Sequence, residues 1–440
     1  MNEKIPCDLL ITDASLLLPD MTIGDNLSLV IDKGIIIAVL PAAEAKSRYL
    51  PKQEINGAGK IWLPGLVDAH MHTGQQLLKG KILDELPMIW TRIMLPFEST
   101  LTPEKMQLSA ELAALEMVEA GTTGFIDAGS YYMHEAAKVY LKSGLRGALS
   151  HSTMDKGDFP ASIKQTTVQA LTSTDSLYNE FHKQGNLRVF YSLRALMNCS
   201  DELICSAAQR AQERDTFLQA HMNEYAGEIN YTLQNFQLRP FAYLAKLGAL
   251  SKRFIAAHCL MLNAEERKLL TQHQVKVVHC PFSNCGKGVP DTPSLLANDV
   301  SVALGTDGAA HGGLSLWNEM KIFRSVMNAV WGTKLADPAI MPAKTILKLA
   351  SSANRLLTDN TKEGLQSGTP ADIIAVDWQK AHLFASQNRV NTLVECVNAG
   401  DVTDSIVAGK ILMHDHEIKT LDKEQIIWKA KRFLAAQVCL

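Results

Sequence analysis

Two histidines with one residue between them are the first residues of this chain whose types and spacing could do chemistry. His70 and His72 close the apolar run Leu63–His72, which has the composition of a buried strand. Because side chains alternate between the two faces of a strand, both imidazoles point to the same side. Two imidazoles so placed can ligate a divalent metal ion. Taken alone, a His-x-His pair is also compatible with the polar end of an ordinary strand.

Other apolar runs further along the chain also end in a side chain of ligand type. These end residues are His221, His258 and Asp307. Together with the first pair they would suit a borderline divalent ion such as Zn²⁺, bound through imidazole nitrogen and carboxylate oxygen. His279 closes a similar run, but Pro281 follows so closely that we expect its imidazole to brace the next turn instead.

The segments that must position these residues alternate between apolar strands and amphipathic helices. Eight strands are predicted, at 63–72, 123–127, 147–151, 189–194, 217–221, 254–258, 275–279 and 300–307. Eight strand–helix alternations over about 290 residues fit a (β/α)₈ TIM-like barrel, in which polar residues at the carboxyl ends of the strands converge at one mouth. The rival fold is a doubly wound open sheet. It would need a glycine-rich phosphate loop after its first strand, and the sequence has none there.

The two ends of the chain differ from its middle. Residues 1–62 and 361–440 contain short β-like runs separated by turns. We expect them to form one small β-sandwich domain, of which residues 1–62 are the first part. Residues 361–440 would supply the second part and a C-terminal helix. The catalytic barrel, residues 63–360, would be inserted between the two parts.

Composition restricts the classes of partner. The chain has 440 residues, of which 47% are hydrophobic and 20% charged, and its net charge is -3. It has no block of lysines or arginines, so the sequence does not indicate a positively charged surface that would bind nucleic acid or a membrane. No apolar stretch reaches the roughly 18 residues of a membrane span. The eight cysteines are scattered and form no Cys-x-x-Cys pair, which indicates a reduced, cytoplasmic protein with small-molecule partners.

Five motifs in order carry a resemblance to a known family. They are Pro64–His72, Ala220–Glu224, Ala257–Cys259, His279–Asn284 and Leu304–Gly308. This series resembles the signature of the amidohydrolase superfamily, in the branch that holds guanine deaminase, methylthioadenosine/S-adenosylhomocysteine deaminase and the triazine hydrolases. The resemblance covers nearly the whole chain, because residues 368–374 and 407–410 are similar to the strands that close the split sandwich of that family.

The resemblance implies one mononuclear metal site with water completing the shell. Its protein ligands would be His70, His72, His221 and Asp307. Zinc is the expected ion, with iron or manganese as alternatives. The metal would lower the pKa of its water toward ~7 and so generate hydroxide, whose proton Asp307 and Glu224 could accept. Glu224 would pass that proton to a ring nitrogen, and His258 would orient the hydroxide. The alternative for Glu224 is a solvated glutamate in a first helical turn.

Two segments are similar to substrate-contacting parts of the methylthioadenosine and homocysteine deaminases. Residues 84–90, which end in Trp90, resemble the segment that supplies an aromatic wall, and Glu98 resembles a carboxylate that contacts ribose. The arginines with which that group binds an amino-acid tail are not found, and His151 occupies one of their positions. The sequence therefore departs from that group where the tail would bind.

Gln75 and Arg194 instead resemble the glutamine and arginine with which guanine deaminase grips its base. An amide offers a donor and an acceptor, and a guanidinium offers a rigid donor fork, which together suit an oxo-heterocycle. A similar glutamine occurs in triazine chlorohydrolases. Gln75 could also be a loop residue facing water, and Arg194 part of a salt bridge at the rim. His311 could contact substrate or only cap the helix that begins near Ser315.

The resemblance thus implies a cytoplasmic hydrolase that acts on non-peptide C–N bonds through a metal-bound hydroxide. We expect a deaminase whose partners are water and a small aromatic nitrogen heterocycle such as a purine, a pterin or a related ring. The alternatives are a triazine-type hydrolase that displaces chloride or an alkylamine, and a nucleoside deaminase like those acting on methylthioadenosine and S-adenosylhomocysteine. A metal-bound scaffold without turnover would not need Glu224 and His258. A homodimer or a higher homo-oligomer is expected.

Overall fold

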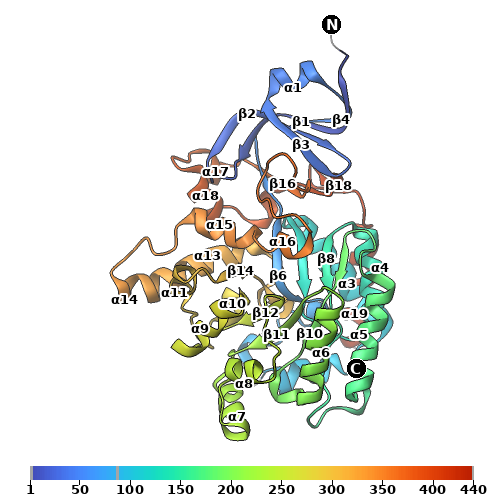
Figure 1. Cartoon of the computed structure of the whole chain (residues 1–440). Coiled ribbons are helices and arrows are strands. Elements are labelled where there is room, and N and C mark those ends of the chain that lie inside the picture. The colour runs from blue at the N-terminus through green and yellow to red at the C-terminus, as the bar shows by residue number, and fades with distance from the viewer. Residues whose placement is uncertain (1–2, 86–88, 439–440) are drawn as a thin grey trace.

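The computed structural model consists of a β-sandwich built by both chain ends and a (β/α)₈ barrel built by the middle of the chain (Figure 1). The structure describes residues 3–85 and 89–438. The fold class predicted from the sequence is confirmed. None of the helices in this described part is long and apolar enough to span a membrane.

The sandwich strands belong to one hydrogen-bonded sheet in the order β19-β18-β17-β16-β5-β1-β2-β3, with β4 paired to β1. Their bounds are β1 Ile5–Leu17, β2 Ile23–Asp32, β3 Ile35–Pro41, β4 Tyr49–Asn56, β5 Lys60–Pro64, β16 Ile373–Asp377, β17 Val402–Val407, β18 Lys410–His414 and β19 Glu417–Ile418. The two chain ends are joined where β5 pairs antiparallel with β16. Trp62, Leu16 and Ile406 lie in the buried core between them.

The barrel strands are parallel and lie in two hydrogen-bonded groups, β15-β6-β7-β8-β9 and β10-β11-β12-β13-β14. Their bounds are β6 Leu66–His72, β7 Thr122–Asp127, β8 Arg146–Leu149, β9 Leu187–Val189, β10 Tyr191–Leu193, β11 Leu218–Met222, β12 Phe254–His258, β13 Lys276–His279, β14 Ser301–Leu304 and β15 Asp307–Gly308. The predicted fourth strand is interrupted at Phe190, and the eighth at Gly305 and Thr306. β6, β7 and β12 are buried throughout, as expected of strands covered on both faces.

The predicted strand 63–72 is in fact two strands. Leu63 and Pro64 end β5, which belongs to the sandwich, and β6 begins the barrel at Leu66. Gly65 stands between them where the chain passes from one sheet to the other. A Cβ at this position would lie 1.9 Å from the Thr123 side-chain oxygen of β7, so the crossing requires glycine.

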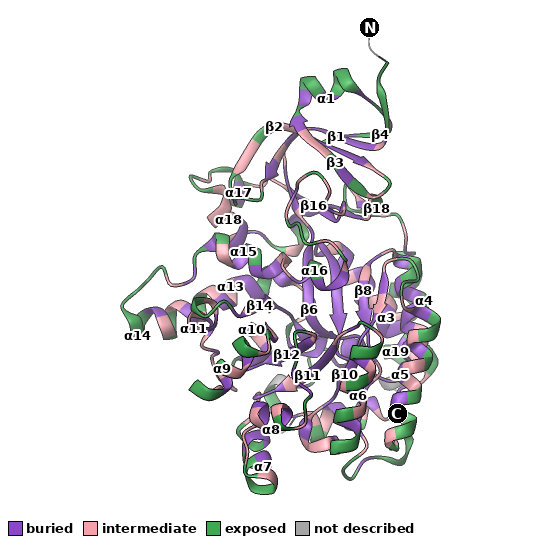
Figure 2. Cartoon of the chain, viewed as in Figure 1, coloured by how far each residue is buried: buried purple, intermediate pink, exposed green. Residues whose placement is uncertain are grey.

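Helices surround the barrel, with their exposed residues facing outward (Figure 2). The longer ones are α3 Pro103–Glu119, α4 Met133–Ser143, α5 Thr167–Phe181, α6 Asp201–Glu213, α7 Ala226–Phe236, α9 Ala264–Gln272, α13 Leu316–Met327, α15 Ala343–Ser351 and the C-terminal α19 Lys423–Val438. Shorter helices are α2 Leu95–Glu98, α8 Pro240–Lys246, α10 Pro281–Asn284, α11 Thr292–Ala297, α12 Ala309–Gly312, α14 Thr333–Leu335, α16 Asn354–Leu357, α17 Ala381–Phe384 and α18 Arg389–Glu395. The short helix α1 Ala42–Arg48 packs against the sandwich strands instead. A π-helical turn covers Trp90–Met94.

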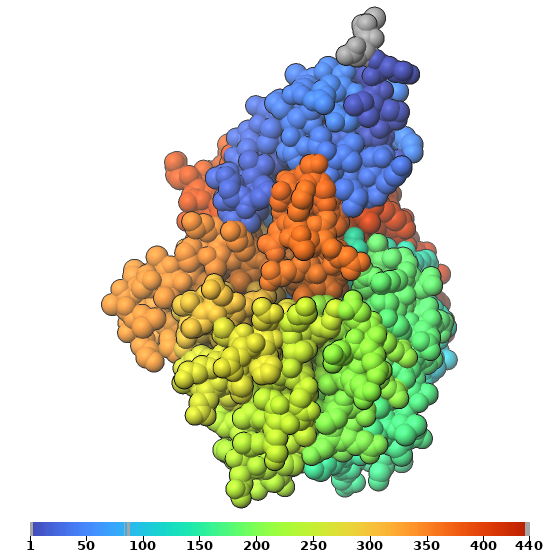
Figure 3. Space-filling model, in the orientation of Figure 1, coloured from blue at the N-terminus to red at the C-terminus, as the bar shows by residue number. Residues whose placement is uncertain are grey.

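The sandwich covers the amino-terminal end of the barrel, because β6 and β8 run away from it (Figure 1). The segment near residue 360 lies between the sandwich and the barrel (Figure 3). Close by, Arg146 of β8 forms a two-pronged ion pair with Asp372, with N···O distances of 2.7 and 3.1 Å. The carboxyl ends of the barrel strands therefore open at the far end.

We predict that Arg146→Met destabilises the protein by about 3 kcal/mol, because it leaves the buried carboxylate of Asp372 without its charged partner. Urea unfolding followed by fluorescence measures the loss. The matched control is Arg389→Met, which breaks a two-pronged pair with Asp25 on the sandwich surface. That pair is exposed, so its loss should cost less than about 1 kcal/mol. Equal losses in the two variants would contradict this account.

Candidate active site

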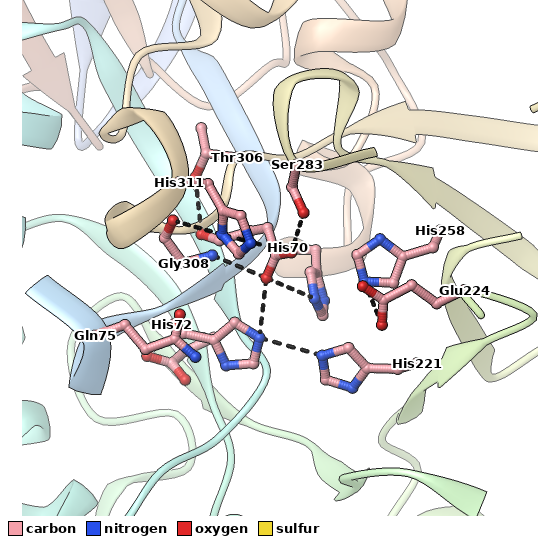
Figure 4. A network of polar contacts seen from close by, with 12 residues as sticks. His70, His72, Gln75, His221, Glu224, His258, Ser283, Thr306, Gly308 and His311 are labelled. Atoms are coloured by element: carbon pink, nitrogen blue, oxygen red, sulfur yellow. Dashed lines mark hydrogen bonds and ion pairs between the residues drawn. The ribbon is translucent and has the colours of Figure 1, made fainter. Parts of the chain in front are cut away.

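The carboxyl ends of four barrel strands bring the predicted ligand-type side chains together (Figure 4). Side-chain ligand atoms of His70, His221, His258 and Asp307 all lie within 4.8 Å of one another. The fifth residue, His72, has its Nε2 atom 3.2 Å from Nε2 of His221 and 3.3 Å from Oδ1 of Asp307. These five residues come from β6, β11, β12 and β15. We call them the histidine cluster.

Two members of the histidine cluster stand on strained backbone. His258 has φ 71° and Asp307 has φ 62°, the left-handed region that side chains other than glycine rarely adopt. Such conformations cost on the order of 1–3 kcal/mol each and persist where the surroundings enforce them. Asp68 supplies one such enforcement, because its carboxylate accepts hydrogen bonds from the backbone N–H and the hydroxyl of Thr306. The bend after β14 therefore aims Asp307 inward.

The imidazoles present lone pairs to the centre of the histidine cluster. Burial lowers the pKa values of His70 and His221 well below the ordinary range, so both rings are neutral at pH 7. Nδ1 of His258 lies 3.0 Å from the Asn284 amide oxygen, which can only accept, so Nδ1 is the donor in this contact. Within the described residues, Nε2 of His70 and Nε2 of His258 are buried and have no hydrogen-bond partner. Neutral imidazoles beside a carboxylate are a donor set for a divalent metal ion.

Arg194 restricts how His72 could bind a metal ion. Its guanidinium lies 3.1 Å from Nδ1 of His72, and a guanidinium can only donate. In this arrangement the neutral ring carries its proton on Nε2 and points that N–H toward Asp307. His72 can therefore ligate an ion through Nε2 only after it changes tautomer and Arg194 leaves Nδ1.

Glu224 stands beside the histidine cluster on the loop that follows β11. One of its oxygens, Oε2, lies 3.7 Å from Nε2 of His258, and the other accepts a 2.6 Å hydrogen bond from the ammonium of Lys287. Burial opposes ionisation of Glu224, but the neighbouring His258 and Lys287 outweigh it and hold the pKa below its ordinary value. Glu224 is thus a carboxylate able to accept a proton.

A cleft opens over the histidine cluster. Four of the predicted substrate-binding residues line it: Gln75, Trp90, Arg194 and His311. The expected aromatic wall is represented by Trp90, whereas residues 86–88 of the same predicted segment lie outside the described residues. A Cβ at Gly308 would lie 1.6 Å from the amide oxygen of Gln75, so a side chain there would displace that amide.

Glu98, the fifth predicted substrate residue, is not among the residues that line this cleft. It lies behind the lining, where its Oε1 accepts hydrogen bonds from Nε2 of Gln75 at 3.1 Å and Nη2 of Arg194 at 2.9 Å. All three side chains are buried. Glu98 therefore holds the side chains of Gln75 and Arg194 in place from behind the cleft.

Three further histidines have distinct surroundings. Nδ1 of His311 bonds the backbone oxygen of Gly308, which leaves its Nε2 as an acceptor at the cleft; His311 does not cap the helix at Ser315. His279 bonds the backbone oxygen of His258 and so braces β13 against β12. His151 bonds the Gln165 amide outside the cleft. Burial lowers the pKa values of His151 and His279 to about 4.

Sequence reasoning missed several residues of the cleft wall. They are Met94, Met197, Tyr225, Glu228 and Lys287. The carboxylate of Glu228 accepts from the backbone N–H of Glu224 and fixes that loop. A signal for Lys287 was present, because it comes three residues after the Ser283-Asn284 pair of a recognised motif. None of the others stands at a strand end, which is the pattern that identified the histidine cluster.

The barrel and the histidine cluster at its mouth define a barrel hydrolase with a divalent-metal donor set. The chain belongs to the amidohydrolase family, whose sequence profile matches residues 61–412. The predicted resemblance is thereby confirmed.

Characterised relatives extend over nearly the whole chain. A 5-methylthioadenosine/S-adenosylhomocysteine deaminase of Syntrophobacter fumaroxidans is 30% identical over 440 residues and covers 98% of each chain. A 5'-deoxyadenosine deaminase of Methanocaldococcus jannaschii is 31% identical over 398 residues, covering 88% of this chain and 92% of its own. Both relatives are deaminases of the family predicted from the sequence.

Solved structures show the same fold. An adenosine deaminase of Xanthomonas campestris with bound zinc superposes with a TM-score of 0.93, at 26% identity and full coverage of both chains. A guanine deaminase of C. acetobutylicum with bound guanine gives 0.81 at 19% identity, covering 93% of this chain and all of its own. A zinc-bound atrazine chlorohydrolase of Arthrobacter aurescens gives 0.88 at 20% identity, covering 96% and 99%. At these identities the last two show the fold alone.

We predict that the purified protein holds about one divalent ion per chain and that His221→Ala loses it, because the variant removes one of the clustered lone pairs. Elemental analysis measures the content. Chelation should lower the melting temperature of the wild type, since the ion stabilises only the folded state. His151→Ala, which removes a buried histidine outside the cleft, is the control and should keep its metal. Active protein without metal, or with two ions per chain, would contradict the prediction.

Proposed function

We propose that this protein is a metal-dependent aminohydrolase. It would replace the exocyclic amino group of a small aromatic nitrogen heterocycle with oxygen from water and release one ammonia. The observation that carries the proposal is the position of Glu224, whose carboxylate faces the histidine cluster within one cleft. A set of metal-binding side chains alone would also be found in a storage or scaffold protein. A carboxylate beside that set that can transfer a proton is what a hydrolase needs in addition.

The metal would be held by His70, His72, His221 and Asp307, and zinc is the first candidate. When bound, a divalent ion supplies a Lewis acid that lowers the pKa of water. His258 stays outside this ligand set because Asn284 fixes its ring and its free Nε2 faces Glu224. Support for the assignment comes from the buried nitrogens of the cluster and from the zinc bound in one similar structure.

The side chains of the protein would then move the protons. Glu224 accepts a proton from the attacking water and delivers it to a ring nitrogen, which prepares the amino group to leave as ammonia. His258 would orient the water through Nε2, which has no hydrogen-bond partner among the described residues. Asp307 is a second acceptor: burial opposes its ionisation, but the hydrogen bond from His72 and the charge of Lys287 hold its pKa low.

The substrate ring would be recognised by Gln75, Arg194 and Trp90, which line the cleft. The amide oxygen of Gln75 is buried and free of partners among the described residues, so it can accept from a ring N–H. Arg194 can donate to an oxo group once it leaves Nδ1 of His72. Trp90 offers a flat apolar face. The activities for which the relatives are named favour aminopurines and their nucleosides among the candidate rings.

The experiment that tests the function is an ammonia-release assay across aminopurines, their nucleosides, pterins and amino- and chlorotriazines. Ammonia from a purine or pterin would support the proposal. Release of chloride or an alkylamine from a triazine would favour the second candidate, a hydrolase with the fold of the triazine enzyme. Metal-loaded protein that turns over no ring would favour a scaffold. A cytoplasmic homodimer or higher homo-oligomer is part of the same proposal, and light scattering tests the assembly.

We predict that Glu224→Gln keeps its metal but lowers kcat by about 100-fold or more, because an amide cannot accept the proton. Steady-state kinetics on the best ring, together with elemental analysis, measure both quantities. Glu265→Gln, an isosteric change at the exposed start of α9, is the control. A Glu224→Gln enzyme that runs near the wild-type rate would assign the proton transfer to another group.

We predict that Arg194→Ala raises KM about 10- to 150-fold on an oxo-bearing ring and much less on its analogue without the oxo group. The reason is that only the oxo ring loses a charged donor, a loss of roughly 1.5 to 3 kcal/mol. Gln75→Ala is the comparison, because it leaves this donor in place. Equal losses on both rings, or a fall in kcat with KM unchanged, would contradict the assignment of Arg194.

A further inference from the structure

A hydrogen-bonded chain connects the two carboxylates of the site through residues that have no role in the proposal so far. The ammonium of Lys287 donates to Oε1 of Glu224 at 2.6 Å and to Oγ of Ser283 at 2.9 Å. The hydroxyl of Ser283 in turn donates to Oδ2 of Asp307 at 2.5 Å. Glu224 follows β11 and Asp307 begins β15, so the chain spans the mouth of the barrel.

The hydrogen-bonded chain binds one oxygen of each carboxylate, and the other oxygen faces the histidine cluster. In Glu224, Oε1 is bound to Lys287, whereas Oε2 faces Nε2 of His258 at 3.7 Å. In Asp307, Oδ2 is bound to Ser283, whereas Oδ1 accepts from the backbone N–H of Gly308 at 2.8 Å and faces Nε2 of His72 at 3.3 Å. A carboxylate held by one oxygen has its rotation restricted, so its other oxygen is already aimed at the histidine cluster.

One short segment after β13 supplies these contacts. Ser283 and Asn284 lie on α10, and Lys287 lies just beyond, where its backbone N–H bonds the oxygen of Asn284 at 3.0 Å. Ser283 contacts Asp307, the Asn284 amide contacts His258, and Lys287 contacts Glu224. This short segment thus contacts Asp307, His258 and Glu224, the three groups that act on the water in the proposed function.

We propose that Lys287 is the positioning residue that fixes the carboxylate of Glu224 for proton transfer. Ser283, which is hydrogen-bonded to Lys287, fixes the carboxylate of Asp307 in the same way. This rests on the proposed function. The side chain of Lys287 is 4% exposed, and a buried ammonium is costly unless it is fully paired. Its partners are the Glu224 carboxylate, the Ser283 hydroxyl and the ring of Tyr225, 5.3 Å from its nitrogen. Although burial lowers it, the pKa of Lys287 is raised by Glu224 and Asp307, so the charge is permanent.

A double-mutant cycle tests whether Lys287 acts through Glu224. Lys287→Met should lower kcat by about 10- to 100-fold with little change in KM, the scale of one charge-assisted hydrogen bond. In a Glu224→Gln background the same change should cost less than about 3-fold, because the group it positions is already disabled. Lys287→Arg, which keeps the charge and a donor, should recover part of kcat. Additive losses, or no loss in the single variant, would overturn the proposal.

The matched control is Lys60→Met. Lys60 is also a mostly buried lysine paired with carboxylates, Asp404 at 2.8 Å and Asp415 at 2.5 Å, but it lies in the sandwich. It should lose stability and keep kcat. If Lys287→Met does not fold, a second double-mutant cycle replaces the first. It combines Ser283→Ala with Asp307→Asn, and additive losses in kcat in this cycle would equally overturn the proposal.

A crystal structure of Lys287→Met separates this proposal from the proposed function. We expect the Glu224 carboxylate to have turned away from Nε2 of His258. A carboxylate that keeps its place overturns the positioning role whatever reaction the protein performs. A wild type that releases no ammonia while the carboxylate turns in the variant would instead reject the proposed function alone.

Discussion

The site depends on the burial of neutral imidazoles and ionised carboxylates in one small volume away from water. Burial alone would protonate the carboxylates, and an imidazole without a partner would lose the hydrogen bonds that water gives it. Contacts within the site offset the first penalty. The hydrogen bond from His72 helps to keep Asp307 ionised, and the pKa of Glu224 stays low beside His258 and Lys287. The unpaired Nε2 of His70 is buried in the histidine cluster, where a cation would satisfy it.

The fold supports this arrangement from behind. Asp68 holds Thr306 and so forces the bend that aims Asp307, while Asn284 fixes the ring of His258. Glu98 likewise holds Gln75 and Arg194 from outside the cleft. The sandwich closes the opposite end of the barrel, so its contribution is to stability and not to the chemistry. Backbone strain at the strand ends is maintained by these contacts.

Much of the fold is predictable from the amino-acid sequence because its signals are local. Parallel strands covered on both faces are continuous apolar runs, and the ends of those runs indicate His70, His221 and His258 directly. The breaks at Gly65 and Phe190 are not predictable in this way, because they depend on which sheet each half of a strand joins. The hydrogen bonds of Glu98 and Lys287 are likewise not predictable, since they join distant segments. Local periodicity carries no information about such contacts.

The central claim is that the oxygen of the product comes from water activated in this cleft as one amino group leaves. Turnover in H₂¹⁸O tests it most directly, with mass spectrometry of the ring product and an ammonia assay on the same sample. The account predicts one ¹⁸O atom per product molecule and one ammonia per turnover, both abolished when the metal is removed. Product without the label, or labelled product with a different leaving group, would contradict it.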